Sequence, residues 1–258
     1  MAAFPDTKRD IALPGGGSWG IAEEVPVEIG FNGTAWTVMM ATPADLEDLA
    51  IGLALTEQII TDAGAVEGLA LKTYPEGITA DIRIAREALT GKALRRRTLD
   101  GQSGCGLCGL ETLAEAIRRP APRSCNRTLP GKPAILKAFY GLAAAQPLNA
   151  ATRSVHAAAW CAPHGAVSLV REDVGRHNAL DKLVGALAHS GQLEDNGFIV
   201  MSSRCSFELV CKAAITNASL LATVSAPTGL ALDLSRELGL PLACRSGEDA
   251  ILFNSGTE

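Results

Sequence analysis

The first third of the chain alternates between apolar and polar positions. Val25, Val27 and Ile29 alternate with other residues, and residues 36–40 resume the pattern after a turn at Asn32-Gly33. Alternation is typical of half-buried strands, and Asn-Gly is a strong hairpin signal because both residues tolerate positive φ. Residues 66–73 and 78–84 repeat this arrangement around a Pro-Glu-Gly turn. The pattern therefore predicts two β-hairpins.

A helical pattern separates the two predicted hairpins. Leu46, Leu49 and Leu53 recur at helical spacing, and Thr42-Pro43 precedes them as a helix cap and a first helical residue. We therefore predict a small α+β lobe over residues 21–97. Residues 1–20 contain a Pro-Gly-Gly-Gly run and are expected to form a flexible leader.

The second half of the chain alternates between short apolar runs and helical stripes, which predicts an α/β domain with a largely buried sheet over residues 110–258. Helices are expected over 110–118, 132–145, 207–219 and 227–238, and around the stripe at 180–187. The predicted strands are 156–161, 166–171, 198–202, 222–225 and 240–244.

Composition narrows the class of protein. The chain has 258 residues, is 47% hydrophobic and carries a net charge of −5. The negative charge argues against a nucleic-acid partner, because a protein that binds nucleic acid needs a basic surface. It has no apolar run long enough to cross a membrane, and residues 1–10 contain no apolar segment of the kind found in secretory leaders, so we do not expect secretion. Seven cysteines, an odd number without scaffold-like spacing, favour free thiols in a cytoplasmic protein.

Two of those cysteines, Cys105 and Cys108, stand in a glycine-rich Cys-Gly-Leu-Cys motif within residues 98–109. Glycine permits unusual backbone geometry and leaves a thiol uncovered, so we expect a mobile, exposed cysteine loop. Three interpretations compete: a chance pair, half of a zinc site, or a reactive thiol that carries sulfur or electrons. The cysteines at 125, 161, 205, 211 and 244 are expected to be small buried hydrophobic residues.

The zinc and disulfide interpretations both lack a partner motif. A closed zinc site needs four ligands, and no second Cys-x-x-Cys motif is present. A nucleobase deaminase needs His-x-Glu, whereas His156 is followed by two alanines. A thioredoxin-type motif follows a strand, which is missing before Cys105. A persulfide relay needs only an exposed thiolate on a flexible segment.

Polar side chains gather in four segments at predicted strand–helix junctions: 152–156, 171–182, 202–206 with Glu208 and Lys212 beyond it, and 225–228. Ligands of α/β proteins bind beyond strand ends, where helix starts expose amide groups that suit phosphates. Arg176 and Arg204 add cationic donors. A polyphosphate ligand fits these segments. Salt-bridged structural junctions, and simple helix caps at Ser206 and Thr228, remain the alternatives.

Several stretches resemble the FdhD family of formate dehydrogenase accessory sulfurtransferases. They are the Cys-Gly-Leu-Cys-Gly motif, residues 152–160, the Glu-Asp-Val-Gly-Arg-His-Asn-Ala-Leu-Asp-Lys string at 172–182, residues 202–213 and the Ser-Ala-Pro-Thr motif at 225–228. The resemblance spans roughly residues 24–245. Departures from the family pattern occur at Ser203 and at Leu242-Ala243, within expected cofactor contacts.

The resemblance implies a sulfur carrier. A cysteine desulfurase would load a persulfide on Cys105, with Cys108 as the second catalytic thiol. The sulfur would then pass to the molybdenum cofactor, in its bis-molybdopterin guanine dinucleotide form, before the cofactor enters the catalytic subunit of formate dehydrogenase. It also implies a homodimer, no metal held by protein side chains, and a cytidine-deaminase-like three-layer α/β/α sandwich beside the smaller lobe.

The expected cofactor-binding residues come from the family's C-terminal segment and from the polar junctions. They are Ala243, Cys244, Arg245, Ser246, Gly247 and Glu248, together with Arg176, His177, Asp181, Arg204, Lys212 and Thr228. The alternative function is a cofactor-binding chaperone whose Cys-x-x-Cys motif is structural or binds zinc.

Overall fold

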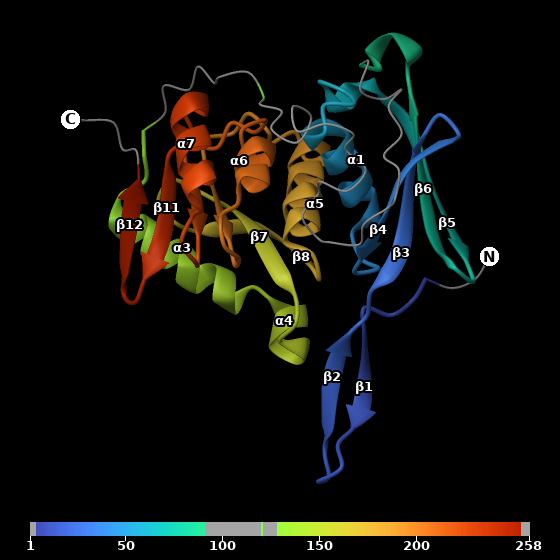
Figure 1. Cartoon of the computed structure of the whole chain (residues 1–258), viewed down its shortest axis with the longest axis horizontal. Coiled ribbons are helices and arrows are strands. Elements are labelled where there is room, and N and C mark those ends of the chain that lie inside the picture. Colours follow the sequence, from blue (N-terminus) through green and yellow to red (C-terminus); the bar gives the residue numbers. More distant parts are fainter. Residues whose placement is uncertain (1–3, 91–119, 121–127, 254–258) are drawn as a thin grey trace.

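The computed structural model describes residues 4–90, 120 and 128–253. Within them the chain forms a mixed α/β structure with three sheets (Figure 1). A four-stranded sheet has the order β4-β3-β6-β5, and a six-stranded sheet has the order β12-β11-β10-β9-β7-β8. The predicted cysteine loop at 98–109 and the helix at 110–118 lie outside the described residues.

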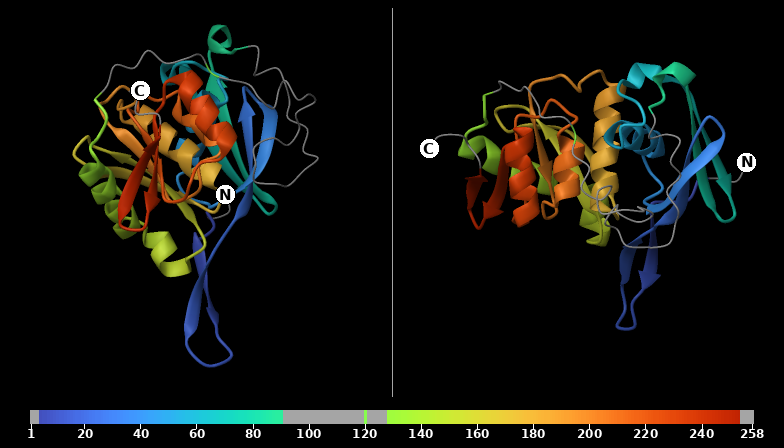
Figure 2. Two further views of the ribbon diagram at one scale, coloured as in Figure 1. Left: turned by 60° about the vertical axis from the view of Figure 1, so that its left-hand side comes forward. Right: turned by 45° about the horizontal axis from the view of Figure 1, so that its top comes forward.

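The first sheet corrects the expectation of a flexible leader over residues 1–20. Strands β1 (Lys8–Ala12) and β2 (Ser18–Ala22) pair antiparallel, with Ile11 opposite Trp19. The glycine run supplies the turn, because Gly16 and Gly17 adopt φ of 89° and 86°. Figures 1 and 2 show this hairpin projecting from the body of the molecule. The same glycines that suggested disorder are the residues that close the hairpin.

The two hairpins predicted for the lobe are confirmed and join into one sheet. Strands β3 (Val25–Phe31) and β4 (Thr34–Ala41) flank the Asn32-Gly33 turn, whose residues adopt φ of 52° and 76°. Strands β5 (Val66–Tyr74) and β6 (Gly77–Ile84) form the second hairpin, and β6 runs parallel to β3. The amide group of Asn32 donates to the Ile84 carbonyl and accepts from its N–H, so the first turn is tied to the second hairpin.

The helix of the lobe begins later than predicted. Helix α1 spans Leu46–Thr56, and its cap residue is Asp45 at φ 51°, not Thr42. Thr42 is used elsewhere: its N–H donates to Asp173 and its hydroxyl accepts from the Val174 N–H. A contact with the second domain has therefore displaced the local helix cap that the sequence suggested.

The six-stranded sheet lies in the part of the chain that we predicted to form the second domain. Its strands are β7 (His156–Cys161), β8 (Val167–Asp173), β9 (Phe198–Met201), β10 (Leu221–Thr223), β11 (Leu242–Ser246) and β12 (Asp249–Phe253). Strands β9, β10 and β11 run parallel, whereas β7 is antiparallel to β8 and β9, and β12 is antiparallel to β11. The predicted strands are confirmed to within about two residues at each end.

Helices cover both faces of this sheet (Figure 2). Helix α3 (Lys132–Ala144) packs Ile135 and Phe139 against one face. Helices α5 (Arg176–His189), α6 (Phe207–Ala213) and α7 (Gly229–Leu238) pack on the other. Strand residues alternate between the faces, with Ala157 and Val200 turned to α3, as period-two geometry requires. Helix α6 ends at Ala213, six residues before the predicted end.

The lobe docks through α1, which lies along α5. A Cβ atom added at Gly52 would lie 1.7 Å from the Asp181 carbonyl oxygen, and one added at Gly185 would lie 1.9 Å from that of Asp48. The two helices therefore meet backbone to backbone at this pair of glycines. Because α5 lies between α1 and the sheet, its residues from His177 to Leu187 are all buried.

Among the described residues, no helix combines the length and apolar character that crossing a membrane requires.

Candidate functional site

The predicted polar junctions converge at one edge of the six-stranded sheet. The parallel strands β9, β10 and β11 end there, and the antiparallel strand β7 begins there at His156. Strand β8 ends beside it, since Asp173 pairs with His156. This edge lies on the side of the sheet where Figure 1 shows α4 (Pro147–Thr152) and the β11–β12 turn. Helices α5, α6 and α7 all start from it, as expected for a ligand-binding edge of an α/β fold.

Asp173 organises the start of α5. Its carboxylate accepts hydrogen bonds from the N–H groups of Thr42 and Gly175 and from the Asn178 amide, and it pairs with Lys182 at 2.7 Å. Neither the Asp173 nor the Lys182 side chain has any exposed surface. This part of the family-like string therefore holds the lobe against the domain and fixes where α5 begins.

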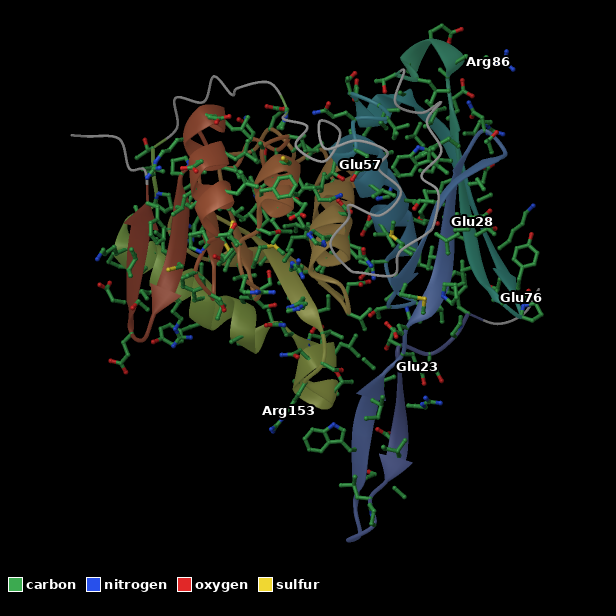
Figure 3. All side chains as sticks on the ribbon, in the orientation of Figure 1. Glu23, Glu28, Glu57, Glu76, Arg86 and Arg153 are labelled. Carbon is green, nitrogen blue, oxygen red and sulfur yellow. The ribbon has the colours of Figure 1, made fainter. Side chains whose placement is uncertain are left out.

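Two predicted cofactor contacts, Asp181 and Lys212, are committed to a second buried network. The Lys212 ammonium donates to both Asp181 oxygens at 2.9 Å and to the Thr56 hydroxyl, and it pairs with Glu57 at 3.2 Å. Figure 3 labels Glu57 near α1. Burial raises the pKa of Asp181 although Lys212 opposes that shift. Asp181 and Lys212 therefore form a buried structural ion pair, which is the alternative that the sequence left open for the polar junctions.

A third cluster lies where α5 and α6 begin. The His177 side chain is 10% exposed and its Nε2 lies 3.9 Å from a Glu208 carboxylate oxygen, too far for a hydrogen bond. Neither His177 Nε2 nor the buried hydroxyl of Ser206 has a hydrogen-bond partner among the described residues.

His156 faces the same region from β7. Burial lowers the pKa of His156, the Arg176 guanidinium lowers it further, and Asp173 opposes both. His156 is therefore neutral at pH 7. The sequence placed Ser206, Glu208 and His156 in its polar segments but did not select them as contacts. His156 interacts electrostatically with His177, and the spacing of the two residues in the sequence gave no sign of this because they lie on different elements.

The cationic residues expected to bind phosphate differ in how accessible they are. Arg204 is exposed and Arg176 is half-buried, and both lie at the sheet edge. Thr228 is exposed and caps α7 by accepting from the Ala231 N–H, so its helix-cap interpretation is confirmed. Ser206 occupies the cap position of α6 but makes no side-chain cap bond.

The C-terminal segment divides into a buried and an exposed part. Ala243 and Cys244 are buried in β11, at 1% and 4% exposure. Arg245 is half-buried, donates to the Gly247 carbonyl and stacks over the Tyr140 ring with a separation of 5.0 Å. Ser246, the last residue of β11, is exposed, as are Gly247 and Glu248, which form the β11–β12 turn. A ligand can therefore reach residues 245–248, but it cannot reach the buried side chains of Ala243 and Cys244.

The described cysteines confirm the expected burial at three positions. Cys161, Cys205 and Cys244 are buried, and Cys211 is half-buried. Burial raises the pKa of both Cys161 and Cys205 to about 12. These two thiols are therefore protonated at neutral pH and unsuited to nucleophilic chemistry. Cys105, Cys108 and Cys125 lie outside the described residues.

A metal centre would need several ligating side chains close together. In the part of the chain that the structure describes, no group of three or more His, Cys, Asp or Glu side chains is arranged to hold a metal ion. Cys105 and Cys108 lie outside that part.

Comparisons with known proteins agree on one family. A sequence model of the FdhD/NarQ family matches residues 22–257. The chain belongs to the FdhD/NarQ family. Two relatives named sulfur carrier protein FdhD are similar over most of their length. The relative from Cupriavidus necator is 48% identical, over 86% of this chain and 77% of its own length. The relative from Variovorax paradoxus is 46% identical, over 90% of this chain and 84% of its own length.

A solved structure shares the fold of this chain. A crystal structure from Desulfotalea psychrophila, of a protein described as a formate dehydrogenase accessory protein, superposes with a TM-score of 0.71. The match covers 96% of this chain and 95% of that one at 23% identity, so it carries the fold alone.

Proposed function

We propose that this chain is a sulfur carrier that serves the maturation of formate dehydrogenase. The observation that carries the proposal is the 46–48% identity, over 86–90% of the chain, to relatives named sulfur carrier protein FdhD. A carrier needs an accessible thiol and a place for the acceptor. The glycine-flanked Cys105–Cys108 motif is proposed to supply the first, and the polar sheet edge is proposed to supply the second.

Cys105 is the residue proposed to carry the sulfur. A cysteine desulfurase presents its own persulfide, and the Cys105 thiolate attacks the outer sulfur, which leaves the desulfurase thiolate behind. The Cys108 thiolate would then attack the inner sulfur of the Cys105 persulfide, which forms a Cys105–Cys108 disulfide and releases the outer sulfur, reduced to the sulfide level, to the molybdenum cofactor. Cys108 stands close enough in sequence to release the sulfur or to protect Cys105 as a disulfide. The buried, protonated thiols of Cys161 and Cys205 are poor substitutes in this reaction.

The acceptor is proposed to be the bis-molybdopterin guanine dinucleotide form of the cofactor, bound at the sheet edge. Arg176, Arg204 and the start of α7 would contact its phosphates, and residues 245–248, at the end of β11 and in the turn after it, would complete the site. Asp181 and Lys212 are not proposed as cofactor contacts, because they form a buried ion pair with each other. The loaded cofactor would then pass to the catalytic subunit of formate dehydrogenase.

Three further features belong to the proposal. The layered second domain is proposed to be a cytidine-deaminase-like sandwich that lacks the zinc chemistry of deaminases, consistent with the alanines after His156. The working form is proposed to be a homodimer in the cytoplasm. Analytical ultracentrifugation tests the dimer, and a single species with the mass of one chain would count against it.

Persulfide detection tests the central step. After incubation with a cysteine desulfurase and cysteine, intact-protein mass spectrometry should show one added sulfur that a reductant removes. Cys105→Ala should lose it, whereas Cys205→Ser, a matched change at a buried thiol, should keep it. The assignment fails if Cys105→Ala still carries the sulfur and still supports formate dehydrogenase activity.

Nucleotide binding tests the acceptor site. GDP represents the guanine dinucleotide end of the cofactor, and calorimetry should show that Arg204→Ala weakens its binding. Arg83→Ala on β6 of the lobe is the control and should bind GDP like the wild type. The alternative function, a chaperone with a zinc-binding motif, predicts instead about one zinc per chain and no transferable sulfur.

A further inference from the structure

The lobe and the hairpin before it carry most of the negative charge of the chain. Residues 4–90 contain 14 acidic and 5 basic residues, a net charge of −9, whereas residues 128–253 contain ten of each. A strong net charge on one part of a protein attracts partners of the opposite sign and repels those of the same sign. A macromolecule that docks on the lobe is therefore expected to present a positive surface.

The sheet of the lobe has a buried inner face and an outer face. Val27 and Ile29 of β3 and Ile78 of β6 are buried with α1 on the inner face. Because successive strand residues point to opposite faces, Pro26 and Glu28 belong to the outer face. Figure 1 shows α1 between this sheet and the six-stranded sheet, so the outer face of the lobe is turned away from the six-stranded sheet.

Exposed apolar side chains form a row across this outer face. Pro26 of β3 pairs with Met40 of β4, and Tyr74 of β5 pairs with Gly77 of β6. The two pairs are neighbours, because a Cβ atom added at Gly77 would lie 3.1 Å from the Pro26 Cβ. Pro26 is exposed, and Met40 and Tyr74 are 44% and 47% exposed. We call Met40, Pro26 and Tyr74 the apolar row.

Acidic residues border the apolar row. Glu28 lies on the outer face of β3, Glu76 stands in the exposed turn between β5 and β6, and Glu24 is exposed just before β3. Figure 3 labels Glu28 and Glu76 on this part of the lobe. Lys72 of β5 also lies on this face, so the border carries three acids and one cation. The local charge around the row therefore has the same sign as the charge of the whole lobe.

We propose that the apolar row is the docking site of a protein partner whose own contact surface is basic around an apolar centre. Protein interfaces place aromatic and Met side chains at the centre, and complementary charges around the centre steer association. A second copy of this chain fits less well, because two lobes of charge −9 would then face each other. Nucleic acids and anionic lipids are negative as well, so the lobe repels them.

A purified cysteine desulfurase is the probe, and its choice rests on the proposed function. The outer face lies beyond α1 and α5 from the six-stranded sheet, so a sulfur donor docked there would leave the proposed acceptor site open. Surface plasmon resonance with the immobilised desulfurase should show binding of the wild-type chain. That binding should weaken as salt rises, because salt screens the attraction between the acidic lobe and a basic surface.

Loss of the apolar side chains tests the centre of the docking site. The double variant Met40→Ser, Tyr74→Ser should bind the desulfurase about tenfold or more weakly, because a few central side chains carry most of the binding energy of an interface. Ile251→Ser on β12 is the matched control, since Ile251 is 43% exposed, and it should bind like the wild type. A wild-type melting temperature shows that the double variant is folded.

Charge reversal tests the acidic border. Glu76→Lys should weaken binding about threefold or more in 50 mM salt, and the effect should shrink in 0.5 M salt. Glu87→Lys makes the same change in net charge beyond the other end of β6, next to Arg86, which Figure 3 labels. It should change binding by less than about twofold, because charges more than a Debye length from the contact are screened.

The outcomes separate this inference from the proposed function. Wild-type binding by the double variant overturns the docking site and leaves the proposed function standing. Equal weakening by Glu76→Lys and Glu87→Lys overturns the acidic border and with it the basic partner. If sedimentation shows that the double variant separates a wild-type dimer into single chains, a second copy occupies the row and the proposal is overturned. If the wild-type chain binds no desulfurase, the proposed donor step and this inference fail together.

Discussion

Lys182 and Asp173 form an ion pair at 2.7 Å in which neither side chain reaches solvent. Each makes further bonds that cross from the second domain to the lobe, because Lys182 donates to the Thr42 carbonyl and Asp173 accepts from the Thr42 N–H. Burying two charges is unfavourable unless both are paired and hydrogen-bonded, and here both are. The pair therefore joins the lobe to the sheet edge.

Asp173→Asn should strongly destabilise the chain. The change leaves the Lys182 ammonium buried without a counter-charge, and breaking one partner of a buried pair costs about 3–5 kcal/mol. Urea denaturation measures the loss. Asp249→Asn is the matched control, because Asp249 pairs with Lys132 on the surface, where such pairs contribute little, and its denaturation midpoint should stay at the wild-type value. Equal midpoints for the two variants would contradict the structural role of Asp173.

The crossing of α1 and α5 predicts an unusual response to alanine. In most helices Gly→Ala is stabilising by up to about 1 kcal/mol, because alanine is the better helix former. At Gly52 or Gly185 the new Cβ would overlap a carbonyl oxygen of the other helix, so the lobe must move away. We expect each variant to lose about 3 kcal/mol or more of unfolding free energy, at the upper end of overpacking costs.

Gly229→Ala is the control for this prediction. Gly229 is the first residue of α7, and a Cβ atom there would have no neighbour within 4 Å. The melting temperature of the Gly229→Ala variant should equal or exceed that of the wild type, whereas Gly52→Ala and Gly185→Ala should each melt at a lower temperature than the wild type. Wild-type melting of Gly52→Ala would mean that the two helices are not in backbone contact in solution.

Local patterns predicted most of the elements. A short apolar run located β7, and the Asn32-Gly33 pair located the first lobe hairpin, because turn chemistry is decided by the turn residues themselves. The sequence also placed the polar segments at strand–helix junctions, and in the structure these junctions lie at one edge of the six-stranded sheet. In each case the deciding interaction lies within a few residues or follows from the general geometry of α/β folds.

Long-range contacts explain what the sequence did not predict. Thr42 resembles a helix cap, but its polar groups bind Asp173 and Val174, some 130 residues away. Lys212 and Asp181 resemble ligand contacts until α1 is placed over them. A cation at a strand–helix junction can serve a ligand or a buried ion pair, and only the docking of the lobe distinguishes the two.

His156 gives the chain a pH-dependent stability. Its pKa is lowered in the folded chain, chiefly by burial and then by Arg176, whereas in the unfolded chain it returns to about 6.5. As pH falls below about 6.5 the unfolded chain takes up the proton first, so the free energy of unfolding falls until the folded pKa is reached. Urea denaturation between pH 7.5 and pH 5 should show this decline.

Two variants identify the histidine responsible. His156→Gln should flatten the decline, since it removes the group whose pKa differs between the folded and unfolded chain. His164→Gln, in the exposed turn before β8, should keep the wild-type slope. A wild-type slope in His156→Gln would assign the pH dependence to other groups.

The buried thiols should resist alkylation in the folded chain. With a pKa of about 12, Cys161 and Cys205 hold on the order of one thiolate in 10,000 at pH 8, and the thiolate is the form that reacts. Iodoacetamide at pH 8 followed by peptide mapping should therefore leave both unmodified, and both should be labelled after denaturation. Cys205 is the sharper case, because it lies at the start of α6 beside the proposed acceptor site. Labelling of native Cys205 at the rate of an exposed thiol would show that this edge opens, and Cys205 would then have to be considered beside Cys105 as a carrier of sulfur.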